Sequence, residues 1–443
     1  MDRDSVVRML LGTTLGLHIV LAVTGLALPL FVLLAEYRGI RHKDADAMLL
    51  ARRAARVFTV TFAIGAVTGT LVAGELAILW APFMTVASQV IILPFFIEGF
   101  AFVLEGALIG IYLYGWERLR PWVHFTVGVG IAIASAASGL LITIVNAWMN
   151  APAGFVLDNG RVVDVHPWRA FFNPGVWPQL AHVLTMSYFM VGMLLLALAA
   201  RDLRRHPDSV AAAKAARLAA WPTTVALVLT IITGDLSGKW LAVHQPEKLA
   251  AMEGLFRTTA FAPEALGGLV SLTARRLYGA IDIPGLLSWL SYGSFSHPVK
   301  GLLAFPPATW PPAPLVHIFF DTMVGLGSLS LLLLVVWLYR ERGRLARPAW
   351  LLWLVMAAGP AAVVTMECGW LVDEFGRQPW IIYEVMHVDQ GITHAPGTVA
   401  IGWTILGLLV LLFAAAPYAA VRAVRQGATG PTDGQDGDGG GEP

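Results

Sequence analysis

The sequence contains little charge and almost no cysteine. Charged residues make up only 13% of its 443 residues, whereas a soluble domain carries about a quarter. The formal net charge is only +1, which argues against nucleic acid as a partner. Cys368 is the single cysteine, which excludes intrachain disulfides, cysteine-ligated iron–sulfur clusters and a C-x-x-C-H haem site. Any redox centre must therefore be held by histidine, methionine or carboxylate.

Apolar residues dominate instead, at 57% of the chain with a mean hydropathy of +0.68. A span of the bilayer needs about 20 apolar residues, and only α-helices satisfy the backbone so many times in lipid at this composition. We therefore predict an all-α integral membrane protein with nine transmembrane helices. The predicted spans lie near residues 9–36, 57–81, 86–115, 123–149, 178–200, 218–242, 312–339, 348–372 and 397–421.

Lysine and arginine are concentrated in alternate loops. The 1–2, 3–4, 5–6 and 7–8 loops and the tail carry 19 of the 30 basic residues. Basic loops stay on the cytoplasmic side of a membrane, which predicts an outside N-terminus and a cytoplasmic C-terminus. The first span is too long for a cleaved signal peptide.

Two predicted outside loops are long, at residues 150–177 and 243–311. The second is not of low complexity, so we interpret it as a binding element, with a short amphipathic piece near 246–257. We predict a transmembrane domain over residues 1–425, including this loop, and a disordered Gly/Asp-rich tail over 426–443.

Ionisable residues inside spans are costly and are functional candidates by default. His18 lies about ten residues into the first span, where imidazole could be a haem ligand or a hydrogen-bonded structural group. Glu98 and Glu105 are seven residues apart and share one helix face. They predict a proton relay or a ligand-plus-relay pair, the alternative being two neutral acids bonded to other helices. Ser135, Ser138 and Asn146 of the fourth span read as residues that join helices.

His182 and Met323 fall at similar depth in the outer parts of their spans. Histidine and methionine together suit a six-coordinate, electron-transferring haem, although a lone methionine is ordinarily an apolar filler. Asp235 interrupts the apolar run of the sixth span. Lys248 and Glu253 follow in the long loop, where alone they would read as a solvated surface helix.

The stretch 369–380 combines carboxylates, an arginine and two tryptophans at the end of the eighth span. Arg377 stands three residues after Glu374. The two could form an interfacial ion pair. Alternatively, Glu374 is a metal ligand and Arg377 neutralises a haem propionate or a paired acid. The candidate residues His18, Glu98, His182, Met323 and Glu374 map to the outer half, and Glu105 points toward the cytoplasm, as expected of a redox site fed with cytoplasmic protons.

The run Gly376-Arg377-Gln378-Pro379-Trp380 and the Lys248/Glu253 spacing resemble those of cytochrome bd-type oxidase subunit I. The resemblance covers most of the chain. It implies that His18 and Glu374 are ligands at an oxygen-reducing di-haem site. The same resemblance implies Arg377 as the neighbouring arginine.

The same resemblance implies His182 and Met323 as axial ligands of a low-spin haem b. It implies a haem-site carboxylate at Glu98 and a proton-path carboxylate at Glu105. The implied catalytic residues are Glu98, Glu105 and Arg377, and the implied quinol-binding residues are Lys248, Glu253 and Asp235, in a quinol loop of the short kind.

The implied cofactors are a low-spin haem b, a high-spin haem b and haem d. The implied partners are subunit II, quinol and O2, and a small single-span subunit is left open. The implied location is the cytoplasmic membrane of a bacterium or an archaeon.

Two positions depart from the family pattern. The family usually spaces the Glu98 and Glu105 equivalents eight apart, and it has arginine where this chain has Asp321. An anion there should lower the haem potential and weaken a quinol site. Our hypothesis is a terminal oxidase subunit that oxidises quinol at the outer face and reduces O2 to water with cytoplasmic protons, generating proton motive force. The alternatives are a bd-like oxidoreductase with a non-quinol donor and a haem-free proton-coupled transporter.

Overall fold

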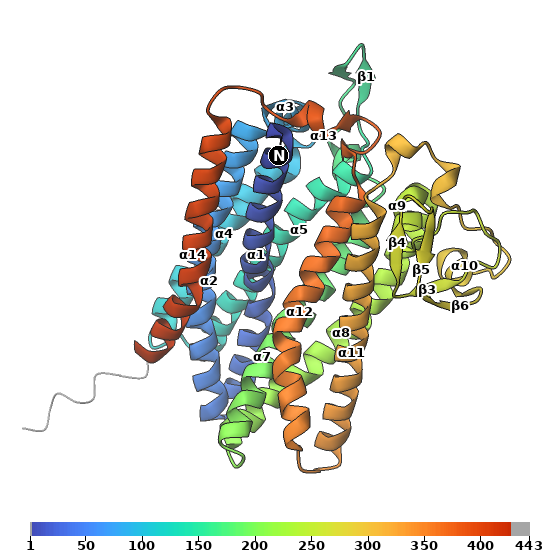
Figure 1. The fold of residues 1–443 in the computed structure, drawn as a ribbon. Helices are drawn as coiled ribbons and strands as arrows, with labels where there is room; N and C mark the ends of the chain where they lie inside the picture. The colour runs from blue at the N-terminus through green and yellow to red at the C-terminus, as the bar shows by residue number, and fades with distance from the viewer. Residues whose placement is uncertain (1, 427–443) are drawn as a thin grey trace, which may run out of the picture.

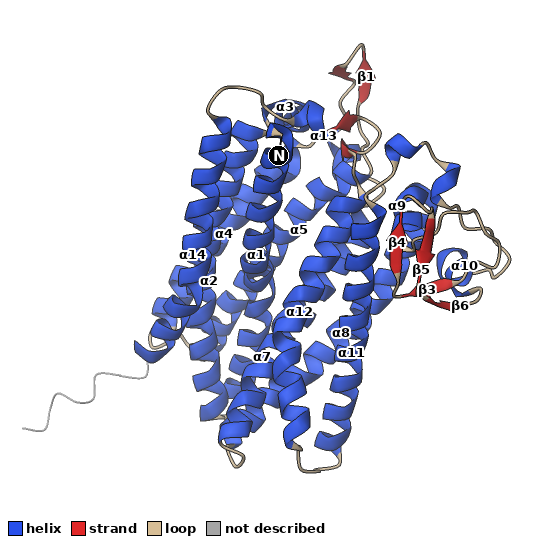
Figure 2. Ribbon diagram, in the orientation of Figure 1, coloured by secondary structure: helices blue, strands red, loops and turns tan. Residues whose placement is uncertain are grey.

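The computed structural model describes residues 2–426 and is dominated by long, nearly parallel helices (Figures 1 and 2). Within these residues nine helices are long and apolar enough to cross a membrane, which confirms the predicted fold class. They are α1 (Arg3–His42), α2 (Ala45–Leu79), α4 (Ile92–Gly115), α5 (Pro121–Asn150), α7 (Val176–Arg205), α8 (Val210–His244), α11 (Ala313–Arg342), α12 (Ala349–Gly376) and α14 (Thr398–Gln426).

The helices form two packed groups. In one, α7 packs on α8 and α12, and α11 packs on α12 and α8. In the other, α1 packs on α2, α5 and α14, and α4 packs on α5. Both α1 and α5 also contact α7 and so join the groups. Helix α7 approaches α8 closely at Gly192, where a Cβ would clash with the Thr223 hydroxyl. Such glycines allow helix backbones to approach in a membrane bundle.

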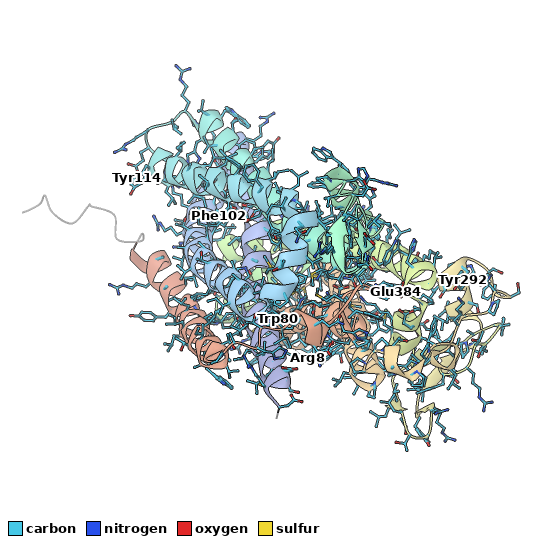
Figure 3. The ribbon with its side chains drawn as sticks, turned by 90° about the horizontal axis from the view of Figure 1, so that it is seen from above. Arg8, Trp80, Phe102, Tyr114, Tyr292 and Glu384 are labelled. Carbon is cyan, nitrogen blue, oxygen red and sulfur yellow. The ribbon has the colours of Figure 1, made fainter. Side chains whose placement is uncertain are left out.

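The long loops gather at one end of the bundle, here called the loop end (Figure 1). The segment between α8 and α11 holds α9 (Pro246–Met252), β3 (Glu264–Leu266), β4 (Leu269–Ser271), β5 (Arg276–Tyr278), β6 (Ile281–Ile283), α10 (Leu286–Tyr292), η1 (Leu302–Ala304) and η2 (Pro307–Thr309). Strand β3 pairs with β6 and β4 pairs with β5, both antiparallel. Viewed along the bundle, this segment, marked by Tyr292, lies on the side away from Tyr114 of α4 (Figure 3).

Other elements complete the loop end. They are α3 (Ala81–Val90), the hairpin β1 (Val156–Asp158)–β2 (Arg161–Val163), α6 (Pro167–Phe171), the hairpin β7 (Trp380–Ile382)–β8 (Met386–His387) and α13 (Val388–Gly391). Only short turns connect the helices at the opposite end. One is the turn from α1 to α2, where Lys43 adopts a left-handed φ of 51° and Asp44 caps α2 by accepting from Ala47 N.

Several predicted boundaries differ from the structure. The third span does not begin at residue 86, because the helix breaks at Ile91 between α3 and α4. Pro94 has no backbone N–H to donate to the carbonyl of residue 90, which favours the break there. Asp235 lies within the continuous helix α8 and pairs with Lys239 one turn along. Of the predicted tail, residues 427–443 lie outside the described residues.

Candidate functional site

His18 of α1 lies against α2 in a fixed tautomer. Its Nδ1 lies 2.9 Å from Thr68 Oγ1, and the Thr68 hydroxyl donates to the Gly65 carbonyl at 3.0 Å. The threonine oxygen therefore accepts from Nδ1–H, so the lone pair of His18 is on Nε2. Within the described residues Nε2 makes no hydrogen bond. A histidine oriented in this way is prepared to bind a metal through Nε2.

His182 of α7 repeats this arrangement against α8. Its Nδ1 lies 3.3 Å from Thr233 Oγ1, and the Thr233 hydroxyl donates to the Leu229 carbonyl at 2.9 Å. Thr233 thus accepts from His182 Nδ1–H, and the lone pair is again on Nε2.

A glycine follows each of these threonines and lies against the imidazole ring. A Cβ at Gly69 would lie 3.1 Å from His18 Cε1, and a Cβ at Gly234 would lie 3.3 Å from His182 Cε1. The space beside each ring therefore exists only because these residues lack a side chain. The Thr-Gly dipeptides at 68–69 and 233–234 are the sequence signal of this arrangement.

Met323 of α11 has a third such glycine beside it. A Cβ at Gly369 of α12 would lie 3.0 Å from Met323 Sδ. Helices α7 and α11 both pack on α8 and α12, so His182 and Met323 belong to the same four-helix group. The structure therefore places the predicted axial pair in one bundle.

Glu374 and Arg377 form an ion pair at the end of α12. Arg377 Nη2 lies 2.5 Å from Glu374 Oε2, and Nη1 donates to the Ile381 carbonyl. Arg377 is only 1% exposed, so this is a buried cation rather than a surface charge. The pair leaves the other carboxylate oxygen of Glu374 for a further ligand.

Glu98 and Glu105 both face α5, as their spacing predicts. Ser138 donates to Glu98 Oε1 at 2.9 Å, and Ser135 donates to Glu105 Oε1 at 2.6 Å. The two serines are thus partners of the acids. Glu105 is the more buried acid and lies about 10 Å nearer the opposite end of the bundle.

Lys248 and Glu253 are buried rather than solvated. Lys248 Nζ donates to Asp373 Oδ1 at 2.7 Å, to the Asp373 carbonyl at 3.1 Å and to Asn150 Oδ1 at 3.3 Å. These three acceptors use all three ammonium hydrogens. Asp373 also accepts from Gln179 Nε2 at 3.2 Å. The sequence did not indicate Asp373 as the partner, because 125 residues separate the two.

A buried polar cluster at the opposite end of the bundle is also absent from our predictions. Glu36 of α1 accepts from the Tyr112 hydroxyl at 2.5 Å and lies 2.6 Å from His124 Nδ1. His124 Nε2 donates to the Tyr112 carbonyl. At the loop end, Glu75 of α2 is fully buried and accepts from Thr14 at 2.6 Å. Both acids lie in predicted spans and could have been found by the rule applied to Glu98.

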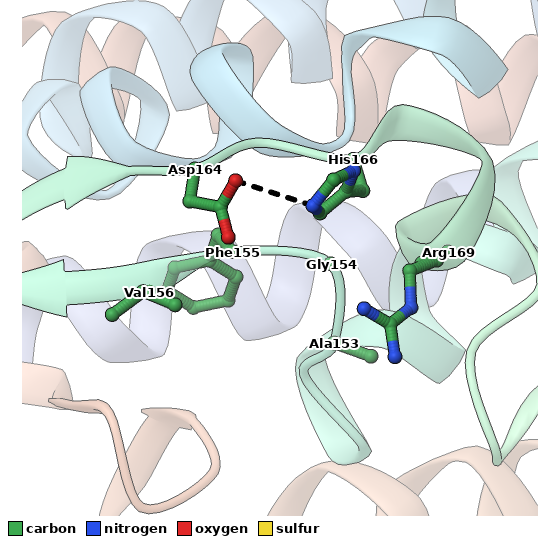
Figure 4. A pocket seen from close by; sticks show the side chains of 7 residues that line it. All are labelled: Ala153, Gly154, Phe155, Val156, Asp164, His166 and Arg169. Atoms are coloured by element: carbon green, nitrogen blue, oxygen red, sulfur yellow. Dashed lines mark ion pairs between the residues drawn. The ribbon is translucent and has the colours of Figure 1, made fainter.

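A hollow of about 220 Å³ lies in the loop before α7 (Figure 4). Its lining residues are Ala153, Gly154, Phe155, Val156, Asp164, His166 and Arg169. Its one ion pair, between His166 and Asp164 at 3.2 Å, is largely exposed. None of the predicted site residues lines it, so we do not assign the chemistry to this hollow.

The donor set fits haem better than a bare metal ion. Among the described residues, no three His, Cys, Asp or Glu side chains converge to hold a metal ion. A haem iron needs only one or two protein ligands. Single imidazoles with a fixed Nε2 lone pair, each beside a glycine, meet that requirement.

Comparison with known proteins agrees with this geometry. The family model for cytochrome bd terminal oxidase subunit I matches residues 6–428. The chain belongs to this family. Cytochrome bd subunits I are quinol oxidase components that carry haem and pair with subunit II in the cell membrane, and this multi-pass chain shares their architecture.

Individual relatives extend the match over nearly the whole subunit. The chain is 38% identical over 404 residues to a provisionally named cytochrome bd menaquinol oxidase subunit I of Bacillus subtilis, covering 89% of this chain and 90% of that one. It is 27% identical over 401 residues to the cytochrome bd-II ubiquinol oxidase subunit 1 of Escherichia coli, covering 75% and 78%. The solved bd oxidase of Geobacillus thermodenitrificans matches with a TM-score of 0.90 and 37% identity, over 96% of this chain and 99% of that one.

Proposed function

We propose that this subunit I oxidises quinol at the loop end and passes the electrons to a site where O2 is reduced to water. The observation that carries the proposal is the repeated arrangement of His18 with Thr68 and His182 with Thr233. Each histidine has its proton on Nδ1 and a glycine beside its ring, so each presents Nε2 to a flat ligand.

Three haems are assigned to these residues. His182 and Met323 would hold a low-spin haem b, and His18 and Glu374 would serve the di-haem site of a high-spin haem b and haem d. The haems supply the electron-transfer and oxygen chemistry. The protein orients the imidazoles through the two threonines, and Arg377 holds one oxygen of Glu374.

Charge distribution supports the loop end as the outer face. The short turns at the opposite end carry the basic residues that favour the cytoplasm. Glu105 lies toward that end and is held by Ser135. Protons for O2 reduction would therefore come from the cytoplasm by way of Glu105 and reach Glu98, and the reaction would generate proton motive force.

The long loop between α8 and α11 is proposed as the binding site of the electron donor. In this proposal Lys248 acts by anchoring α9 to α12 through Asp373, and Glu253 presents a free carboxylate oxygen. Asp235 of α8 is proposed as a third quinol-binding residue. The complex would comprise subunits I and II, with a small single-span subunit left open, in a bacterial or archaeal cytoplasmic membrane.

The proposal is tested on the purified two-subunit complex. His182→Ala should abolish the low-spin haem band and quinol:O2 oxidation. His166→Ala, at an exposed histidine between β2 and α6, should change neither. Asp321 favours a second candidate, a bd-like oxidoreductase with another donor. That candidate gains support if the parent complex reduces O2 with an artificial electron donor but does not oxidise quinol.

A further inference from the structure

His317 of α11 connects this helix to the long loop. The side chain is fully buried. Its Nδ1 lies 2.7 Å from the Met252 carbonyl, and its Nε2 lies 3.2 Å from the Gly267 carbonyl and 3.3 Å from Asp321 Oδ2. Each ring nitrogen therefore lies near a backbone carbonyl, one at the end of α9 and one between β3 and β4.

Two carboxyl groups with free oxygens lie on the segments that His317 contacts. Glu253, at the end of α9, is only 5% exposed, and Glu264 lies on β3. Within residues 2–426, Oε2 of each has no hydrogen-bond partner. Burial, together with the Glu264 and Asp321 carboxyls, raises the pKa of Glu253 well above its usual range. Burial and the Asp321 carboxyl raise the pKa of Glu264 to about 7.

The two acids differ in exposure and influence each other electrostatically. Glu253 is buried, whereas Glu264 is partly exposed. His317 connects their segments, because it contacts α9 at Met252 and the β3–β4 turn at Gly267. One side chain of α11 therefore fixes both segments that carry the acids.

We propose that Glu264 is the proton acceptor through which quinol oxidation at this subunit releases its protons to the outside. This inference rests on the proposed function. Oxidation of one quinol to quinone gives two electrons and two protons. The electrons would be taken up by the haem that His182 and Met323 would hold. The protons pass through Glu253 to Glu264 and then to bulk water, which leaves both carboxylates ready for the next quinol. His317 is the positioning residue that keeps the two acids adjacent.

The titratable groups on the elements around Glu264 bear on the expected pH dependence. They are Glu253 after α9 and His317 and Asp321 on α11; Asp282 lies on the paired strand β6. Glu264 accepts a proton only when it is ionised. Quinol oxidation should therefore rise with pH through about 7 and level off above it.

The test compares Glu264→Gln with Asp282→Asn in the two-subunit oxidase. Asp282 is an exposed acid on the neighbouring strand, so it is the matched control. With a quinol donor, Glu264→Gln should lower kcat at least ~10-fold, enlarge the solvent deuterium isotope effect and remove the rise in rate near pH 7. With tetramethyl-p-phenylenediamine, which gives electrons without protons, both variants should match the parent. Glu264→Asp should restore part of the quinol rate.

The outcomes separate the two proposals. If the parent complex oxidises quinol and Glu264→Gln behaves like Asp282→Asn with both donors, the proton-release role is wrong and the proposed function stands. If Glu264→Gln loses both donor activities equally, the residue is structural and the inference also fails. If the parent reduces O2 with the phenylenediamine but never with quinol, the quinol part of the proposed function fails first.

Discussion

Lys248 of α9 and Asp373 of α12 form an ion pair with a distance of 2.7 Å between Nζ and Oδ1. The pair joins the long loop to the last turn of α12, one residue before Glu374. The Lys248 side chain is only 4% exposed. This ion pair therefore links the loop proposed to bind the electron donor to the helix end proposed to hold the di-haem site.

Breaking this pair should destabilise the complex. In Lys248→Ala, Asp373 would lose its charge partner in a partly buried site, at a cost of about 1–3 kcal/mol. The double variant Lys248→Met/Asp373→Leu should recover part of that loss, because no unpaired charge remains. The measurement is the thermal unfolding midpoint of the purified complex.

The control is Lys239→Ala, which removes a more exposed pair with Asp235 within α8. Exposed pairs contribute about 0–1 kcal/mol, so its midpoint should hardly move. Equal destabilisation by Lys248→Ala and Lys239→Ala would contradict the connection described above.

Gly369→Ala should disturb the low-spin haem. The new Cβ would lie 3.0 Å from Met323 Sδ, closer than such atoms normally approach, so the thioether must move from its position. Gly325→Ala on α11 meets no atom within 4 Å and serves as the control. Reduced absorption spectra should show a weakened low-spin band only for Gly369→Ala. Identical spectra for the two variants would argue against Met323 as the ligand.

Thr68→Val and Thr233→Val should each weaken one haem site. Either change removes the acceptor for a histidine Nδ1–H, and loss of such a group typically costs 10–100-fold in metal affinity. Thr68→Val should lower haem content at the di-haem site, and Thr233→Val at the low-spin site. Thr70→Val, at an exposed residue of α2, should leave haem content unchanged. Should Thr68→Val also retain every haem, the assigned His18 tautomer would be wrong.

Glu105→Gln should slow O2 reduction without loss of haem. The variant keeps the shape of the side chain near Ser135 but cannot give up a proton, so a loss of roughly 10²-fold is expected. Glu117→Gln changes an acid whose side chain is 82% exposed and should have little effect. Single-turnover oxidation of reduced complex in vesicles, followed by a pH dye, measures proton uptake from the cytoplasmic side. A normal rate in Glu105→Gln would place the proton path elsewhere.

The number and type of helices could be predicted because the bilayer imposes a length and a composition on each span. Hydropathy could not predict the helix break at Ile91, because the surrounding residues form a continuous apolar run. The break follows instead from the missing backbone N–H of Pro94. The end of α9 at Met252, five residues before the predicted end, likewise depends on packing against α11 and α12.

Single ligands could be proposed from sequence because an isolated histidine or acid in a span is costly. The partners of these residues could not be predicted, because residues such as Lys248 and Asp373 are far apart in sequence and come into contact only in the folded chain. His317 was overlooked for the same reason. Its partners are two carbonyl oxygens, at Met252 and Gly267, which no side-chain pattern can indicate.

The most direct measurement is a dithionite-reduced minus oxidised absorption spectrum of the purified two-subunit complex, with haem extraction. The account predicts both b-type and d-type bands, with the low-spin b band missing in Met323→Leu. Haem b alone would restrict the chain to a bd-like variant without haem d. A colourless complex would contradict the account. The intramembrane carboxylates would then favour a haem-free proton-coupled transporter.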